Sequence, residues 1–193
     1  RVALTIAINE GPIAAVKEIT IEGAPQFSQR QLKKNFKLTT SGMATFITHK
    51  DRYSEQQLEQ DLQQLQTFFL NRGYLQYHLV SKDASMTDDH KAVTIKVVVS
   101  PGAVFTINRI SLSSDIKNNP EIAGLVTVKP GQVFSRAKIM TVNQAIGDYY
   151  ADRGYAFPQV HVTPTLNTKE KTVDLSFSIS KGKLTYVRQV TFS

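Results

Sequence analysis

An internal repeat constrains this 193-residue sequence more than any other feature. Three segments align without gaps, each with apolar residues at alternate positions and each ending in glycine. They are VALTIAINEG (2–11), VTIKVVVSPG (93–102) and VDLSFSISKG (173–182). Alternation with a period of two is typical of a strand that buries one face. A second strand-like run begins five residues after each glycine, so the sequence predicts the same strand–glycine–strand junction three times.

Two longer segments between these junctions also align without a gap. They are SEQQLEQDLQQLQTFFLNRGY (54–74) and SRAKIMTVNQAIGDYYADRGY (135–155). Their apolar residues recur at the spacing of one helix face, so each segment is predicted to form a helix. Ser54 is predicted to cap the first of these, with Gln57 completing a capping box. A shorter helix is predicted before each long one, and the residue pairs that signal the starts are Ser28 with Gln31 and Asn119 with Pro120.

The tripeptide RGY closes both long helices, at 72–74 and 153–155. A cation near a helix end complements the dipole, and a glycine suits the left-handed position that terminates a helix. An aromatic residue is favourable at the start of the following strand. Gly73 and Gly154 are therefore predicted to be structural caps, with strands at 74–85 and 155–166. We interpret the repeated motif as punctuation in a repeated fold, and not as a paired active site.

The order of elements predicts an α+β fold made of tandem βααββ domains. Each domain is expected to be a three-stranded mixed sheet covered on one face by two helices. The predicted boundaries are 1–13 for the last strand of a preceding domain, 14–101 and 102–183 for two complete domains, and 184–193 for the first strand of a following domain. Linkers of only a few residues predict domains that are articulated rather than freely tethered.

Composition argues against an enzyme. The sequence has no cysteine, no Walker-type loop, no nucleophile elbow and no dinucleotide fingerprint, so no cofactor is predicted. Its four histidines lack metal-ligand spacing, so no metal site is predicted. Asp88 and Asp89 fall in a predicted hairpin turn, where aspartate is favoured for local hydrogen bonding. These residues are therefore not expected to form a catalytic pair.

Nucleic-acid binding is the alternative from a different functional class. The net charge is +7, but the excess is spread along the chain without a run of five like charges. Strand–helix–helix–strand units also occur in KH domains, which need a GXXG loop to hold the nucleic-acid backbone. No GXXG is present, so a KH-like module stays a remote alternative.

The tandem βααββ pattern resembles POTRA domains, and more closely those of the BamA family of outer-membrane protein assembly factors. The resemblance rests on VKEITIEGAPQFSQRQLKKNFKL (16–38), DRYSEQQLEQDLQQLQTFFLNRGY (51–74), VKPGQVFSRAKIM (128–140) and DRGYAFPQV (152–160). The long segment 39–53 resembles the enlarged loop of the third POTRA domain, so 14–101 and 102–183 resemble POTRA 3 and POTRA 4. The POTRA region of a related translocation or secretion transporter such as TamA is the alternative within the same fold.

This resemblance implies a periplasmic scaffold whose parent is anchored in the outer membrane by a C-terminal barrel. The implied partners are a BamB-like lipoprotein, other subunits of the assembly machinery and unfolded outer-membrane proteins. By the same resemblance, the lipoprotein contact is assigned to Phe36, Leu38 and Thr39. Leu38 lies outside the clean helical stripe and is preferred as a contact, whereas Phe36 is equally compatible with a place in the core.

The two predicted domains differ in one strand. An exposed sheet edge can accept another strand, and proline blocks such an edge because it has no N–H to donate. The second domain carries Pro158 and Pro164 there, whereas 75–85 has no proline. We therefore expect the first domain to bind partner strands by β-augmentation, with a capped or merely solvated edge as the alternative. The predicted edge residues are Leu75, Gln76, Tyr77, His78, Leu79, Val80 and Ser81.

Overall fold

The computed structural model describes residues 14–40, 52–89 and 91–184. The predicted outer strands at 2–9 and 186–193, most of the loop at 39–53, and both His49 and His90 lie outside these ranges. Contacts divide the chain after Phe68 and after Pro101 into two compact units, and the segment Phe69–Gln76 is grouped with the second.

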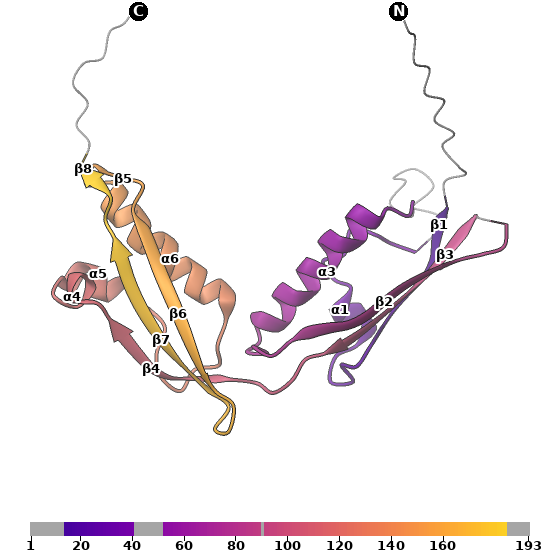
Figure 1. Ribbon diagram of the computed structural model, residues 1–193, viewed down its shortest axis with the longest axis horizontal. Helices are drawn as coiled ribbons and strands as arrows, with labels where there is room; N and C mark the ends of the chain where they lie inside the picture. The colour runs from indigo at the N-terminus through magenta and orange to yellow at the C-terminus, as the bar shows by residue number, and fades with distance from the viewer. Residues whose placement is uncertain (1–13, 41–51, 90, 185–193) are drawn as a thin grey trace, which may run out of the picture. The chain divides into compact units, whose positions relative to one another are not determined.

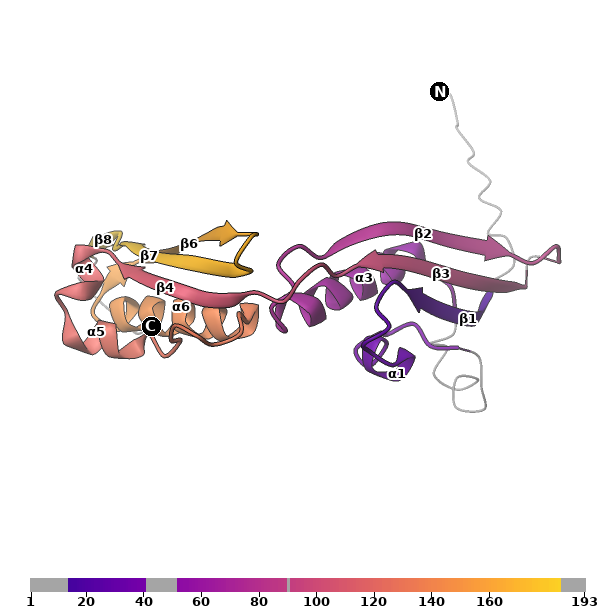
Figure 2. The same cartoon turned by 90° about the horizontal axis from the view of Figure 1, so that it is seen from below.

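The first unit is a three-stranded sheet with helices on one face (Figures 1 and 2). The strand order is β1–β3–β2, in which β1 runs parallel and β2 antiparallel to the central strand β3. Its elements are β1 (Ala15–Glu22), α1 (Gln29–Leu32), α3 (Glu55–Leu70), β2 (His78–Met86) and β3 (Ala92–Ser100). The mixed sheet and the α+β class predicted from the repeat are confirmed.

Local signals explain where the helices of the first unit begin. At α1, Ser28 Oγ accepts the Gln31 amide at 3.3 Å and the Gln31 side chain accepts the Ser28 amide at 2.9 Å, which is a complete capping box. At α3, Ser54 Oγ accepts the Gln57 amide at 3.3 Å. The Gln57 side-chain amide donates to Asp61 Oδ1 at 3.2 Å, one turn further into the helix. The two helix starts are therefore capped differently.

The core of the first unit lies between the sheet and α3. Leu58 and Leu65 of α3 are each 1% exposed, as the apolar stripe predicts. The central strand contributes alternate residues, which is the strand period of two. These are Val93, Ile95, Val97 and Val99.

The second unit repeats this architecture with additions. Its main sheet has the order β4–β7–β6, again with one parallel and one antiparallel pairing, and β5 and β8 form a separate two-stranded antiparallel sheet. Its elements are β4 (Thr106–Leu112), α4 (Ser114–Lys117), α5 (Pro120–Leu125), α6 (Arg136–Ala151), β5 (Tyr155–Ala156), β6 (Gln159–Asn167), β7 (Thr172–Ser180) and β8 (Lys183–Leu184).

The sequence predicted α5 but not α4. Asn119 Oδ1 accepts the amides of Glu121 and Ile122, as expected of an N-cap followed by proline. The additional turn α4 buries Ile116 completely. The helix α1 is equally short, but its Ser28–Gln31 capping box marks it in the sequence, whereas Ser113 at the start of α4 makes no side-chain cap hydrogen bond.

Both RGY glycines have the left-handed conformation, with φ of +86° at Gly73 and +83° at Gly154. The neighbouring residues differ from expectation. Arg153 lies beyond the end of α6, where its guanidinium bonds the Tyr149 carbonyl at 3.1 Å and Glu121 at 3.0 Å and stacks 3.5 Å above the Tyr149 ring. Tyr74 does not begin a strand, since β2 starts only at His78.

Candidate partner-binding edge and adjoining hollow

The β2 strand forms an outer edge of the first sheet. It pairs with β3 on one side, and no described strand pairs with its other side. All nine residues from His78 to Met86 are exposed. The outer side of an edge strand is where another strand can be added. This edge is the surface at which the sequence predicted partner binding.

The usable part of the edge is shifted from the predicted residues. Leu75, Gln76 and Tyr77 precede β2 and lie outside the strand, because the chain makes a turn after α3. A register shift between Leu79 and Ser81 makes Val80 a bulged residue, and its side chain is 57% exposed. Bulges interrupt pairing and twist an edge. The regular edge therefore runs from Ser81 to Met86, where the register with β3 is unbroken.

Hydrogen-bond alternation indicates which backbone groups of β2 point outward. The Thr87 amide donates to the Ala92 carbonyl at 2.9 Å, so this opposed pair is hydrogen-bonded. Bonded and non-bonded pairs alternate along an antiparallel ladder. Lys82, Ala84 and Met86 therefore direct their N–H and C=O groups away from β3. These three residues supply the outward backbone groups of the regular edge.

The side chains along this edge form a partly open apolar margin. Leu79, Ala84 and Met86 lie opposite buried residues of β3 and therefore share the helix-facing side, yet Leu79 is 38% and Met86 48% exposed. Lys82 lies on the same side and reaches α3, where it pairs with Glu59 and, at 3.6 Å, with Glu55. These acceptors, Glu59 first, raise the pKa of Lys82. The edge strand is thereby tied to α3 by charge while its apolar side chains stay accessible.

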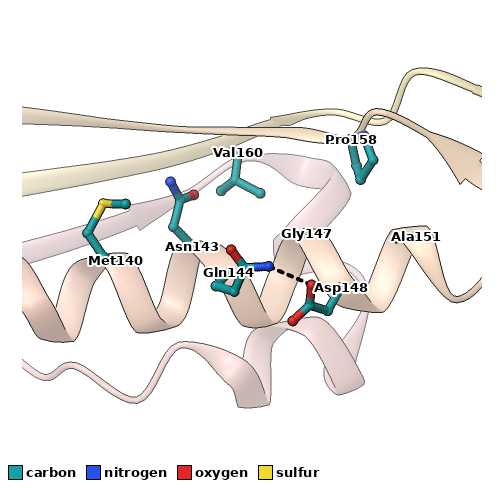
Figure 3. Close-up of a pocket in the computed structure, with 8 residues that line it drawn as sticks. All are labelled: Met140, Asn143, Gln144, Gly147, Asp148, Ala151, Pro158 and Val160. Carbon is teal, nitrogen blue, oxygen red and sulfur yellow. Dashed lines mark hydrogen bonds between the residues drawn. The ribbon is translucent and has the colours of Figure 1, made fainter.

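The equivalent edge of the second unit is interrupted by proline. Pro164 lies opposite Leu175, which is the register position that Ala84 holds opposite Ile95. A proline inside an edge strand is tolerated where its nitrogen faces away from the ladder, so Pro164 removes one outward donor. An adjoining hollow has a volume of about 330 Å³. Figure 3 shows two of its lining residues on α6, Met140 and Asn143, across from Val160. The edge strands of the two units therefore differ at one register position, where β2 has an N–H donor and β6 has none.

The predicted lipoprotein contacts line another hollow, which lies in the first unit and has a volume of about 560 Å³. Leu38 is only 3% exposed, so the preference for it over Phe36 as a contact finds no support in its position. Phe36 is half-buried and offers more surface. The residues lining this hollow are Phe36, Lys37, Leu38, Thr39, Arg52, Ser54 and Gln57.

Asp61 hydrogen-bonds three residues that line this hollow, and the sequence did not single it out. Its carboxylate is 1% exposed and accepts the amides of Lys37 and Leu38, both at 2.9 Å, together with the Gln57 side chain. The available signal was an acidic residue on the apolar face of the helix, three positions after Leu58. Asp61 thereby anchors the segment after α1 to α3.

Asp88 and Asp89 lie in the turn between β2 and β3. Asp89 Oδ1 accepts the Thr87 hydroxyl at 2.6 Å and the Lys91 amide at 3.2 Å, which is the turn role expected for it. Over the described ranges, no three His, Asp or Glu side chains gather as metal ligands. No helix in that part of the chain has the length and apolar content to cross a membrane.

Comparison with known proteins identifies the repeated unit. The family model for POTRA, described as surface antigen variable number repeat, matches residues 14–102 and 105–182. The chain belongs to the POTRA family. The POTRA repeat therefore accounts for both units, and the resemblance to BamA is confirmed.

Similar proteins include BamA outer membrane protein assembly factors. One from Neisseria meningitidis serogroup B is 31% identical over 98% of this chain, and one from Buchnera aphidicola is 28% identical over 100% of it. The chain spans only 24% and 31% of these relatives. The structure of POTRA3-5 of Haemophilus influenzae BamA matches 92% of this chain and 70% of that one, with a TM-score of 0.74 and 20% identity, and supports the POTRA fold.

Proposed function

We propose that this chain is the periplasmic POTRA part of an outer-membrane protein assembly factor, where it serves as a non-enzymatic scaffold. Its first unit binds unfolded outer-membrane proteins by adding their strands to β2. The observation that carries the proposal is the regular, exposed and proline-free edge from Ser81 to Met86. The name of the full-length relatives, outer membrane protein assembly factor, supports the substrate class. The POTRA region of a transporter such as TamA stays the alternative within the family.

Strand addition suits a scaffold that receives many sequences. Main-chain hydrogen bonds are the same for every substrate, so they provide affinity without selecting a sequence. Each such bond contributes about 0.5–1.5 kcal/mol net. The exposed side chains of Leu79 and Met86 add a preference for apolar residues at alternate positions. Transmembrane strands of outer-membrane proteins have that alternation.

A BamB-like lipoprotein and other subunits of the machinery are the further partners in this proposal. The hollow at Phe36 and Thr39 is proposed as the lipoprotein contact, with Leu38 as part of its buried wall.

Ala84→Pro tests strand addition. Proline at this position removes an outward donor, as Pro164 does in the second unit, and leaves the bonds to β3 intact. A synthetic peptide that copies a transmembrane strand should slow hydrogen exchange at Lys82 and Ala84 in the unmodified chain. We expect Ala84→Pro to weaken this peptide at least about tenfold, since it loses one backbone bond and meets the proline ring.

Pro164→Ala is the matched reciprocal variant, because it restores a donor at the same register position of β6. It should create peptide-dependent protection in the second unit. Asp83→Pro is the disruptive control, since Asp83 lies at a position bonded to β3 and its substitution should damage the sheet itself. Peptide affinity unchanged in Ala84→Pro, with the fold intact, would contradict binding at this edge. Val80 is a less suitable place for proline because the bulge already breaks the ladder there.

A further inference from the structure

The hollow of the first unit lies in a strongly basic stretch of the chain. Residues 28–40 contain four cations and no acidic residue, and Arg52 lines the hollow from the other side. The four cations are Arg30, Lys33, Lys34 and Lys37. Of these, Lys37 lines the hollow, and together with Arg52 it gives the described lining a positive charge that favours an anionic occupant.

Two cations, Lys37 and Arg52, line the hollow. Neither residue forms an ion pair with any described residue, and both are exposed. Asp61, whose carboxylate bonds the backbone of Lys37 and Leu38, is buried and already accepts three donors. Within the described ranges, the charges of Lys37 and Arg52 are therefore not matched by an ion pair.

The lining combines this charge with apolar and hydrogen-bonding groups. Phe36 and Leu38 supply an apolar wall, and Ser54 and Gln57 supply polar groups at the start of α3. A concave apolar wall beside two cations fits a carboxylate-bearing segment with an apolar side chain to insert. A flat membrane surface or a nucleic-acid backbone would engage exposed cations without filling the hollow.

Asp61 gives the hollow a fixed shape. By accepting the amides of Lys37 and Leu38, it sets the backbone that carries both a cation and part of the apolar wall. A surface held in its binding conformation loses less entropy when a partner docks. The equivalent position in the second unit is Val142, which is 1% exposed and offers no acceptor, so this arrangement belongs to the first unit.

We propose that this hollow docks an acidic segment of a protein partner. An apolar side chain of the segment packs against Phe36, and its carboxylates pair with Lys37 and Arg52. Asp61 acts as a positioning residue that holds the Lys37–Leu38 backbone in place. This recognition chemistry deepens the proposed accessory-subunit contact and rests on it for the class of partner.

The test uses the whole chain and a short synthetic peptide in which aspartate and glutamate flank one leucine. Fluorescence anisotropy of the labelled peptide should report saturable binding. Lys37→Glu and Arg52→Glu should each weaken it about tenfold at low salt, since each converts an attraction into a repulsion. Phe36→Ala should weaken it as well, because the leucine loses its apolar contact. A peptide with glycine in place of leucine should bind the unmodified chain about as weakly as the leucine peptide binds the Phe36→Ala variant.

Lys169→Glu is the matched control, because it makes the same charge change at an exposed turn of the second unit. Equal losses in Lys169→Glu and Lys37→Glu would overturn the proposal, since binding would then follow net charge. Tighter retention on anionic vesicles or heparin than on the peptide, lost with Lys37→Glu, would replace it with a lipid or nucleic-acid site. Ala84→Pro should weaken the strand peptide and leave acidic-peptide binding unchanged. The two measurements therefore test strand addition at β2 and docking at the hollow separately.

Discussion

Replacing Asp61 with asparagine tests how the hollow is built. The two carboxylate oxygens divide their work, because Oδ1 accepts the Lys37 amide and Oδ2 accepts the Leu38 amide. Asparagine keeps one acceptor oxygen and places an NH₂ group where the second oxygen was. At least one backbone amide then faces another donor in a site that is 1% exposed. The side-chain shape is nearly unchanged, so lost hydrogen bonding is the main perturbation.

The expected cost follows from these contacts. A buried donor left without its acceptor costs about 1–3 kcal/mol, and bonds to a charged acceptor are stronger than bonds to a neutral one. Losing one such bond and weakening the other predicts a destabilisation of about 2–4 kcal/mol for the segment after α1. At about 1.4 kcal/mol per factor of ten, its amides should exchange roughly 30- to 700-fold faster.

Hydrogen exchange measured residue by residue by NMR checks this expectation at Lys37 and Leu38. Amides of β6 and β7 in the second unit provide the internal reference. Asp88→Asn is the control variant, because Asp88 is an exposed turn residue of the same unit and loses the same charge. If Lys37 and Leu38 exchange at the same rates in Asp61→Asn as in the unmodified chain, the carboxylate does not anchor this segment.

Three further outcomes follow from single positions. Gly154→Val should destabilise the second unit by at least about 1–3 kcal/mol in urea unfolding, because φ is +83° there. Gly147→Ala should instead stabilise it by up to about 1 kcal/mol, since an added Cβ on α6 meets no atom within 4 Å; a loss of stability would contradict this. Burial raises the pKa of Tyr77 to about 12, so unfolded chains ionise first and stability should fall from pH 10 toward pH 12. Tyr77→Phe should flatten that decline in alkaline unfolding curves, and an equally steep decline would count against burial as its cause.

The sequence by itself determined the repeated architecture. Alternating apolar residues predicted the strands, and the stripe of Leu58, Leu65 and Phe69 predicted the buried face of α3. The Ser28 capping box and the Asn119–Pro120 start were also readable. These features depend on neighbours within a few residues, so local periodicity and hydrogen bonding are enough to specify them.

Only the tertiary structure decided which atoms of the candidate sites are available. The bulge at Val80 and the outward position of Ala84 depend on the register between β2 and β3, which sequence alternation alone does not define. Likewise, Leu38 is buried and Asp61 is satisfied because the segment after α1 folds against α3, more than twenty residues away along the chain. Strand pairing and helix packing join residues that are distant in the sequence. For that reason the regular edge lies at 81–86 in the structure, whereas the sequence predicted it at 75–81.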